Sequence, residues 1–415
     1  MLKCAEVFHA RLLRDRVAGN SVLKRAPVRR SSRSGIPNLG DGRAVTRSMY
    51  RRALAVTNGF SEVITTRLRH VALAGLISLL AFATTNAFAQ VRGIGASFPS
   101  KVYERWARTY EQQNAGAAVS YKATGSGDGV KQISAHAVDF GGSDTPLPAD
   151  ELTKRKLVQV PMLIGGIVPV LKLPGIGANR LQLSGELLAD IMAARIAKWN
   201  DARIAAQNPG VALPALRIQR IVRADRSGTT EGFTRYLSEV SPAFKTEIGA
   251  SQAPKWPGQV TTAEGNDGMV KALDAAEGGI AYVSYDRVVK DELAAVRLVN
   301  GAGVAVAASE AGFRAAILDS DVARAGNDLA SLMNRPASGA WPITQTSFVL
   351  FDAEPADADR AAQGMRFLYW CLMHGDDLTR GTGFAPLPVN LQARLTARFA
   401  GVRAKDGKAP QYMNF

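Results

Sequence analysis

The chain has 415 residues, of which 47% are hydrophobic and 21% charged, so it can bury a large core and is expected to hold more than one domain or lobe. Its net charge of +15 is uneven, because fifteen of the 51 Lys and Arg residues fall in residues 1–89, beside only four Asp or Glu. The remainder carries 36 basic against 32 acidic residues, a net charge of about +4. This near-balance of charge beyond residue 89 gives little support for nucleic acid as a partner.

Residues 67–89 have the order of a secretory signal peptide. Two arginines precede an apolar run over residues 71–82, and a triplet of small, aromatic and small residues ends at Ala89. We expect cleavage before Gln90 and therefore a periplasmic protein. The apolar run is short for a membrane span, and no later stretch of 18 or more apolar residues follows it in the sequence.

Residues 1–66 precede a complete signal peptide, and their first 48 positions are rich in arginine and serine without hydrophobic periodicity. Two interpretations remain open for this segment. It is either a disordered extension or the product of a start codon placed too early, with Met49 or a codon nearer Arg67 as the true start. We favour the second.

The sequence contains two cysteines, Cys4 and Cys371. Since Cys4 would be lost with the leader, the exported chain would hold one thiol and no internal disulfide, although the periplasm is oxidising. Cys371 follows a run of large apolar residues, which predicts that it is a buried core residue.

Beyond residue 90, strand-like and helix-like segments alternate. The strand candidates are Ala118–Ala123, Val138–Gly141, Leu163–Leu171, Ile218–Arg223, Gly279–Val283 and Ser347–Phe351. The helix candidates are Ser100–Gln113, Gly129–His136, Ser184–Ala194, Thr230–Val240, Gly268–Ala276, Glu310–Leu318 and Ala356–His374. Such alternation predicts α/β lobes with mainly parallel sheets flanked by helices, and binding loops at the strand ends.

Two glycine-rich loops join strands to helices early in this region. The first, residues 93–99, brings Ser97 and Phe98 to the entry of a helix, and the second places Ser126 at a similar turn. Either loop alone is weak evidence, because such turns are common in α/β proteins. Neither matches a dinucleotide or Walker motif, since Val130 stands where a third glycine would be needed and no Gly-Lys-Ser/Thr occurs.

A third loop supplies the groups of an oxyanion cradle. Arg223 offers a planar fork of donors, and Asp225 offers a carboxylate to orient it. Ser227, Gly228 and Thr229 open a predicted helix, whose first amides lack partners within the helix and whose dipole favours an anion. The alternative is an ordinary Ser/Thr helix cap next to a surface Arg–Asp pair.

Six short segments occur in order along the chain: Gly95–Pro99, Gly125–Gln132, Val138–Asp144, Lys198–Asn200, Arg223–Thr229 and Gly265–Gly268. Their order and spacing resemble those of the periplasmic phosphate-binding proteins of phosphate-specific ABC transporters. The resemblance covers the chain from Val91 to Phe415. Each segment is short, and the specificity lies in the combination.

This resemblance implies a periplasmic binding protein of type II, in which two lobes are joined by two crossover strands and close over the ligand. The crossings are expected near Gly165-Gly166 and near Ala340–Ile343. Lobe I would comprise residues 90–165 and 341–415, and lobe II residues 166–340. The phosphate contacts implied at matching positions are Ser97, Phe98, Ser126, Asp144, Arg223, Ser227, Gly228 and Thr229, with Asp225 in a supporting role.

The resemblance also implies the partners, which are inorganic phosphate and the membrane permease and ATPase subunits of an importer. It implies no cofactor, no metal and no enzymatic activity, and we expect a monomer. Two residues depart from the family pattern. Arg226 stands where a small residue is usual, and Asp128 where the loop is usually glycine or small. Facing inward, Arg226 would add positive potential and Asp128 would repel the anion; the alternative for either is to point to solvent, which is commoner for a charged loop residue.

Asp144 gives a chemical reason for choosing phosphate over sulfate. A carboxylate only accepts hydrogen bonds, so it needs a proton on the ligand; hydrogen phosphate carries one at neutral pH and sulfate does not. Against sulfate, Asp144 would be a buried acceptor without a partner, facing an unprotonated oxygen. The alternative for Asp144 is a helix N-cap ahead of Thr145.

Two other functions are alternatives for these residues. One is a receptor for another tetrahedral oxyanion such as sulfate or molybdate. The other is a phosphatase-like enzyme in which Ser227 attacks a phosphoester beside Arg223. The second has little support from the sequence, because two of the four histidines lie in the leader and the other two, His136 and His374, are isolated from each other.

Overall fold

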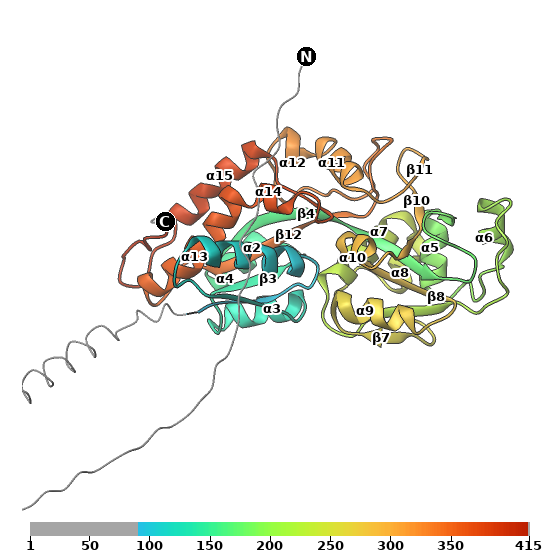
Figure 1. Cartoon of the computed structure of the whole chain (residues 1–415), viewed down its shortest axis with the longest axis horizontal. Helices are drawn as coiled ribbons and strands as arrows, with labels where there is room; N and C mark the ends of the chain where they lie inside the picture. The colour runs from blue at the N-terminus through green and yellow to red at the C-terminus, as the bar shows by residue number, and fades with distance from the viewer. Residues whose placement is uncertain (1–89, 414–415) are drawn as a thin grey trace, which may run out of the picture. The chain divides into compact units, whose positions relative to one another are not determined.

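The computed structural model describes residues 90–413, so the predicted signal peptide and the two interpretations of residues 1–66 lie outside the described part of the chain. Within it, ten strands form one sheet in the order β2-β1-β3-β12-β4-β8-β6-β7, with β13 and β9 also paired to β4 (Figure 1). These strands are β1 (Val91–Gly95), β2 (Val119–Ala123), β3 (Phe140–Ser143), β4 (Leu157–Lys172), β6 (Gln219–Arg223), β7 (Thr261–Ala263), β8 (Gly279–Ser284), β9 (Ala294–Ala295), β12 (Thr344–Asp352) and β13 (Phe384–Ala385).

Lobe I is the name used below for the half of the sheet that contains β2, β1, β3 and β12. The first three strands pair in parallel, and β12 joins them antiparallel to β3. Sequence reasoning missed β1, because its two glycines indicate a loop. Gly93 is needed there, since a β-carbon at this position would overlap the ring of Phe140 on β3.

Lobe II is the half that contains β8, β6 and β7, which also pair in parallel. A separate small sheet in the order β11-β10-β5 lies in the same part of the chain, with β5 at Gln182–Leu183, β10 at Arg297–Val299 and β11 at Ala305–Val306. The outer strands of both lobes are therefore parallel, as the alternation of strands and helices predicts. Antiparallel pairing is confined to the middle of the main sheet.

The middle of the sheet is formed by β4 and β12, which connect the lobes. β4 pairs with β12 over residues 157–166 and then with β8 over residues 167–172. The change of partner falls at Gly165 and Gly166, where a side chain would meet the rings of Phe384 and Phe313. The predicted strand from Leu163 to Leu171 thus covers only the crossing part of β4.

The second connection enters β12 from Trp341, whose indole nitrogen donates to the Ile167 carbonyl at 2.9 Å. Before it, the chain contacts the C-terminal helices. Arg398 pairs with Asp328 through two hydrogen bonds of 2.8 and 2.9 Å, and Glu310 accepts from the Gly383 amide at 2.9 Å. The segment before residue 340 therefore touches lobe I, and the boundary of lobe II at that residue stays a prediction.

Three helices begin two or three residues before the apolar periodicity predicts. They are α3 (Ser126–Ser134), α7 (Gly228–Val240) and α9 (Gly265–Asp274). Their first turns consist of glycine and small polar residues, which carry no hydrophobic signal and have low helix propensity. These first turns lie close to residues of other loops, and the apolar pattern does not reveal them.

Helices flank both lobes, with α2, α3 and α13 against lobe I and α5, α7, α8 and α9 in lobe II (Figure 1). The bounds not yet given are α2 (Ser100–Gln113), α4 (Ala149–Arg155), α5 (Gly185–Met192), α6 (Ala202–Gln207), α8 (Pro242–Glu247), α10 (Tyr285–Lys290), α11 (Glu310–Leu318), α12 (Asp321–Arg324), α13 (Ala358–His374), α14 (Asp376–Thr379) and α15 (Val389–Ala400). Every helix of the described residues is too short or too polar to cross a bilayer. Cys371 on α13 is free and buried, as predicted.

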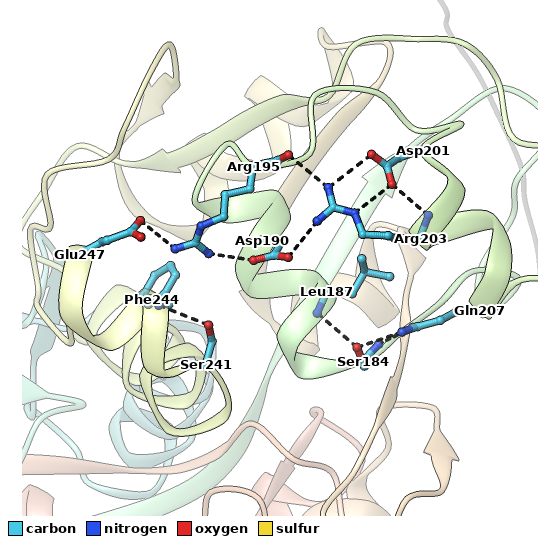
Figure 2. Close-up of polar contacts among 10 residues, drawn as sticks. All are labelled: Ser184, Leu187, Asp190, Arg195, Asp201, Arg203, Gln207, Ser241, Phe244 and Glu247. Atoms are coloured by element: carbon cyan, nitrogen blue, oxygen red, sulfur yellow. Dashed lines mark hydrogen bonds and ion pairs between the residues drawn. The ribbon is translucent and has the colours of Figure 1, made fainter.

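A network of ion pairs links α5, α6 and α8 on lobe II (Figure 2). Arg195 donates to Asp190 and to Glu247, each at 2.7 Å, and Arg203 donates to Asp190 at 3.2 Å and to Asp201 at 3.1 Å. Arg195 retains 27% side-chain exposure, so each pair contributes on the order of 0.2–1 kcal/mol to stability.

Candidate functional site

The hydroxyl of Ser126 joins three of the predicted segments. Ser126 is the first residue of α3 in lobe I, and its Oγ accepts from the amide of Asp144, which follows β3, at 3.1 Å. The same Oγ accepts from the amide of Gly228, the first residue of α7 in lobe II, at 3.2 Å. A β-carbon at Gly228 would overlap Ser126 Oγ, so glycine permits this close approach. The two lobes therefore meet at the predicted site.

Arg223 ends β6 and is held by Asp225. Its Nε donates to Asp225 Oδ1 at 2.7 Å and its Nη2 to Asp225 Oδ2, which forms a bidentate pair. Asp225 Oδ1 also accepts from the Gly265 amide at the start of α9, at 3.1 Å. The Arg223 side chain is 1% exposed, which is inconsistent with the alternative of a surface pair. Its third nitrogen, Nη1, is buried and has no partner.

Asp144 is 6% exposed and its two oxygens differ. Oδ1 accepts from the Ser347 hydroxyl at 2.7 Å, whereas Oδ2 is buried without a partner. Burial raises the pKa of Asp144 to about 7, against the lowering effects of the Ser347 hydrogen bond and the Arg223 charge. The alternative that Asp144 caps a helix is wrong, because the next helix, α4, has Pro148 at its N-cap.

The start of α7 presents two hydroxyls. Ser227 is the N-cap, and its Oγ accepts from the Thr230 amide at 3.1 Å, which leaves its proton free to donate. Thr229 Oγ1 is buried and has no partner. Thr230 is turned away from it and forms a hydrogen bond of 2.8 Å with the hydroxyl of Tyr282, which also accepts from the Arg223 amide at 3.3 Å.

Ser97 and Phe98 lie before α2 and are buried. Ser97 Oγ accepts from the amide and the side-chain Nδ2 of Asn266, at 3.3 and 3.0 Å, which links lobe I to the start of α9. The Phe98 ring packs edge-on against Phe384 with centroids 5.0 Å apart. Phe98 can therefore offer a ligand only its backbone.

Two residues that depart from the family pattern lie at the edge of this region. Asp128 Oδ1 accepts from Gln132 Nε2 at 3.1 Å, one turn along α3, so the carboxylate is engaged on its own helix. Arg226 is exposed, and its carbonyl accepts from the Gly127 amide at 3.1 Å. A β-carbon on Gly127 would lie 2.6 Å from Arg226 Cβ, so the two loops pack closely here.

Sequence reasoning missed three residues that shape the site: Ser347, Asn266 and Tyr282. Ser347 lies 203 positions from Asp144, and no local pattern indicates that the two meet. Asn266 lies in a segment that carries the resemblance, Gly265–Gly268, and this was a signal for it. Tyr282 is on β8, where its apolar neighbours indicate only a buried strand.

The site therefore holds two unpaired donors, Arg223 Nη1 and Thr229 Oγ1, and one unpaired carboxylate oxygen, Asp144 Oδ2, all buried. Buried polar atoms are normally hydrogen-bonded, so three unpaired ones among neighbouring segments indicate an absent partner. A partner that accepts from an arginine and a hydroxyl, and donates one proton to a carboxylate, is a protonated oxyanion. The helix N-terminus of α7 adds a favourable dipole, while its Gly228 and Thr230 amides donate to Ser126 Oγ and Ser227 Oγ.

Comparisons with known proteins identify the family to which the chain belongs. Residues 82–373 match the PBP superfamily domain. The phosphate-binding protein PstS of Xylella fastidiosa is 38% identical over 311 residues, which are 75% of this chain and 85% of the relative. PstS of Pasteurella multocida is 38% identical over 329 residues, 79% and 95% of the two chains.

The fold is also found in solved structures. A phosphate-binding protein from Stenotrophomonas maltophilia superposes with a TM-score of 0.56 at 22% identity, covering 78% of this chain and 98% of that chain. The chain is thus a two-lobed α/β binding protein of the PBP superfamily. Within that superfamily, it belongs to the family of the phosphate-binding protein PstS.

Proposed function

We propose that this protein binds inorganic phosphate between its two lobes and delivers it to the permease and ATPase subunits of an ABC-type importer. The observation that carries the proposal is the buried trio of unpaired atoms on Arg223, Thr229 and Asp144. The membership of the PstS family supports the same ligand.

In this proposal, each group has a separate role toward the anion. Arg223, fixed by Asp225, directs Nη1 at one phosphate oxygen and supplies the charge. Thr229 and Ser227 donate their hydroxyl protons, and Gly228 contributes the helix terminus. Ser97, Phe98 and Ser126 complete the cradle from lobe I, the first two at a helix entry and the third at the start of α3.

Asp144 provides the selectivity. Its Oδ2 accepts the proton that hydrogen phosphate carries, whereas sulfate would leave the carboxylate unpaired against a negative oxygen. The same argument disfavours a receptor for sulfate or molybdate, which we keep as the alternative.

Calorimetric titration of the chain from Gln90 onward, with phosphate and with sulfate at two pH values, tests the proposal. We expect strong heat with phosphate and weak competition by sulfate. Sulfate or molybdate binding as tightly as phosphate would favour the alternative receptor.

We infer further that the protein is not an enzyme. Ser227 Oγ already caps α7, and His136, one of the two histidines of the described residues, pairs with Asp352 at 2.7 Å. A phosphate-ester turnover assay on the purified protein tests this, and steady release of phosphate that Ser227→Ala abolishes would contradict it.

The location and the organisation of the chain complete the proposal. We propose a monomeric periplasmic protein that starts at Gln90, with lobe I at residues 90–165 and 341–415 and lobe II at residues 166–340. N-terminal sequencing of exported material checks the start, and an exported form that begins before Arg67 would contradict it.

A further inference from the structure

Glu231 lies on the first turn of α7, outside the trio of unpaired atoms, and its two oxygens have separate partners. Oε2 accepts from the Thr145 hydroxyl at 2.7 Å, and Oε1 accepts from Arg235 Nη2, one turn along the same helix, at 2.6 Å. The Glu231 side chain is 16% exposed. The hydrogen bond to Thr145 is therefore largely shielded from water, which strengthens it.

Thr145 directly follows Asp144, and its backbone is held firmly. The Thr145 amide donates to Ser143 Oγ at 3.2 Å, and the Ser143 hydroxyl donates to the Thr145 carbonyl at 2.6 Å. A hydrogen bond made by the Thr145 side chain therefore also restrains the turn that carries Asp144.

A third side chain strengthens the contact. Gln252 Nε2 donates to Thr145 Oγ1 at 3.3 Å, while the Gln252 carbonyl accepts from the Ser227 amide at 3.1 Å. Gln252 and Glu231 both belong to lobe II, so Thr145 of lobe I is held from two positions beside the cradle.

Thr145 and Glu231 are 86 residues apart and belong to different lobes. Their hydrogen bond exists only when the Asp144 turn lies against the start of α7. Of the other direct bonds here, those from Gly228 to Ser126 and from Gly127 to Arg226 use a residue of the cradle or backbone atoms alone, and that from Gln252 ends on the same Thr145 hydroxyl. The Glu231–Thr145 bond can be removed by side-chain exchange without touching the proposed phosphate contacts.

We propose that Glu231 is a positioning residue for phosphate binding, which holds the lobes in the closed arrangement by accepting from Thr145 and so keeps Asp144 opposite the α7 terminus. This inference rests on the proposed function. A contact present only in the closed form stabilises that form alone, so its loss acts on release. Because the acceptor is charged and shielded, we expect phosphate release to accelerate about tenfold without this bond, with the association rate unchanged.

The experiment measures association and release rates by stopped flow for the wild type, Glu231→Ala, Thr145→Val and the double variant. Each single variant should release phosphate about tenfold faster or more, since Thr145→Val also removes the Gln252 bond, and the double variant should release it no faster than Thr145→Val alone. Glu231→Gln should restore slow release in part, because its amide oxygen still accepts from Thr145.

Arg235→Ala is the matched control, since it removes the other partner of Glu231 and leaves the bond between the lobes intact. It should release phosphate at the wild-type rate. The inference is overturned if Arg235→Ala accelerates release as much as Glu231→Ala, if the two single effects simply add, or if neither single variant changes release.

A second readout does not require phosphate. Amide hydrogen exchange of residues 143–146 in the ligand-free protein should be faster in Glu231→Ala and Thr145→Val than in the wild type and Arg235→Ala. If the wild type gives no heat with phosphate while these exchange differences appear, the proposed function fails and the contact between the lobes stands. Unchanged exchange together with unchanged release overturns the contact itself.

Discussion

Two regions of the molecule combine arginine with carboxylate side chains but differ in how completely these groups are paired. They are the ion-pair network of α5, α6 and α8 and the cradle at the start of α7. In the network, Arg195 and Arg203 find carboxylates for their guanidinium nitrogens within the protein (Figure 2). In the cradle, Arg223 is more deeply buried, yet one of its nitrogens has no partner, and neither has one carboxylate oxygen of Asp144.

In this protein, the difference separates a structural charge cluster from the proposed binding site. In a partly exposed network the charged groups pair with one another, and any group left without a protein partner can hydrogen-bond to water. Buried groups have no water to bond to. Each unpaired atom among them therefore raises the free energy of the ligand-free protein until a ligand supplies the partner. Variants in the two regions test this contrast between the network, whose charged groups are paired, and the cradle, where three buried polar atoms are not.

The largest effect is expected at Arg223. Arg223→Ala should weaken phosphate binding by roughly 1.5–3 kcal/mol or more, because it removes a charge-assisted donor and leaves the Asp225 carboxylate, whose side chain is only 13% exposed, without its partner beside the site. Arg226→Ala, three residues along, should have a much smaller effect, since Arg226 is exposed. Calorimetry on both variants measures this, and equal losses would mean that the anchor has been misassigned.

Asp144→Asn should change selectivity rather than remove binding. The amide keeps the size of the carboxylate but can donate, so an unprotonated oxygen becomes an acceptable neighbour. The affinity for sulfate relative to phosphate should rise by on the order of 1–3 kcal/mol. Competition titration with the two anions gives the ratio, and an unchanged ratio in a folded variant would leave Asp144 with a purely structural role.

The selectivity of the wild type should depend on pH through Asp144, whose pKa burial raises to about 7. Below that pH the carboxyl carries a proton that it can donate to sulfate, and above it the group only accepts. The preference for phosphate over sulfate should therefore grow as pH rises through 7, and Asp144→Asn should lack this dependence. Titrations between pH 5.5 and 8.5, roughly spanning this pKa, check the slope.

The raised pKa of Asp144 also predicts how the stability of the folded protein changes with pH. The folded ligand-free protein holds a proton on Asp144 that the unfolded chain releases near its ordinary value, so stability falls as pH rises from about 4 to about 7. Urea unfolding of the wild type should show this loss, and Asp144→Asn should show less of it. An identical pH profile for the two proteins would contradict the assignment of the shift to Asp144.

The smallest effect is expected in the network. Arg195→Ala should lower the free energy of unfolding by about 1 kcal/mol or less, because its pairs with Asp190 and Glu247 are partly exposed. Phosphate affinity should not change. Urea unfolding and calorimetry on the same preparation separate the two quantities, and a loss of affinity here would erase the proposed distinction between the regions.

The sequence predicts the cradle better than its surroundings, for a physical reason. Arg223, Asp225 and Ser227 lie on one strand-to-helix turn, so their chemistry is visible in a short window of sequence. Ser347 and Asn266 reach the site from distant elements, and only the tertiary structure brings them in.

The same limit applies to the elements of the fold. Helices with a full apolar stripe, such as α2 and α11, are predicted to the residue. β1 is missed because Gly93 must leave room for the Phe140 ring, and glycine is a turn signal in sequence. The contact between Thr145 and Glu231 is equally invisible, since both residues are common in solvent-exposed loops and helices.

The strand β4, which belongs to both lobes, has a consequence for unfolding. It pairs with β12 along its first part, with one register shift, and with β8 along the rest, and all but two of its sixteen residues are buried. Neither lobe can lose its sheet without exposing the strand that the other lobe needs. The two lobes should therefore melt together in a single cooperative transition, in contrast to domains joined by a flexible linker, which often melt in steps.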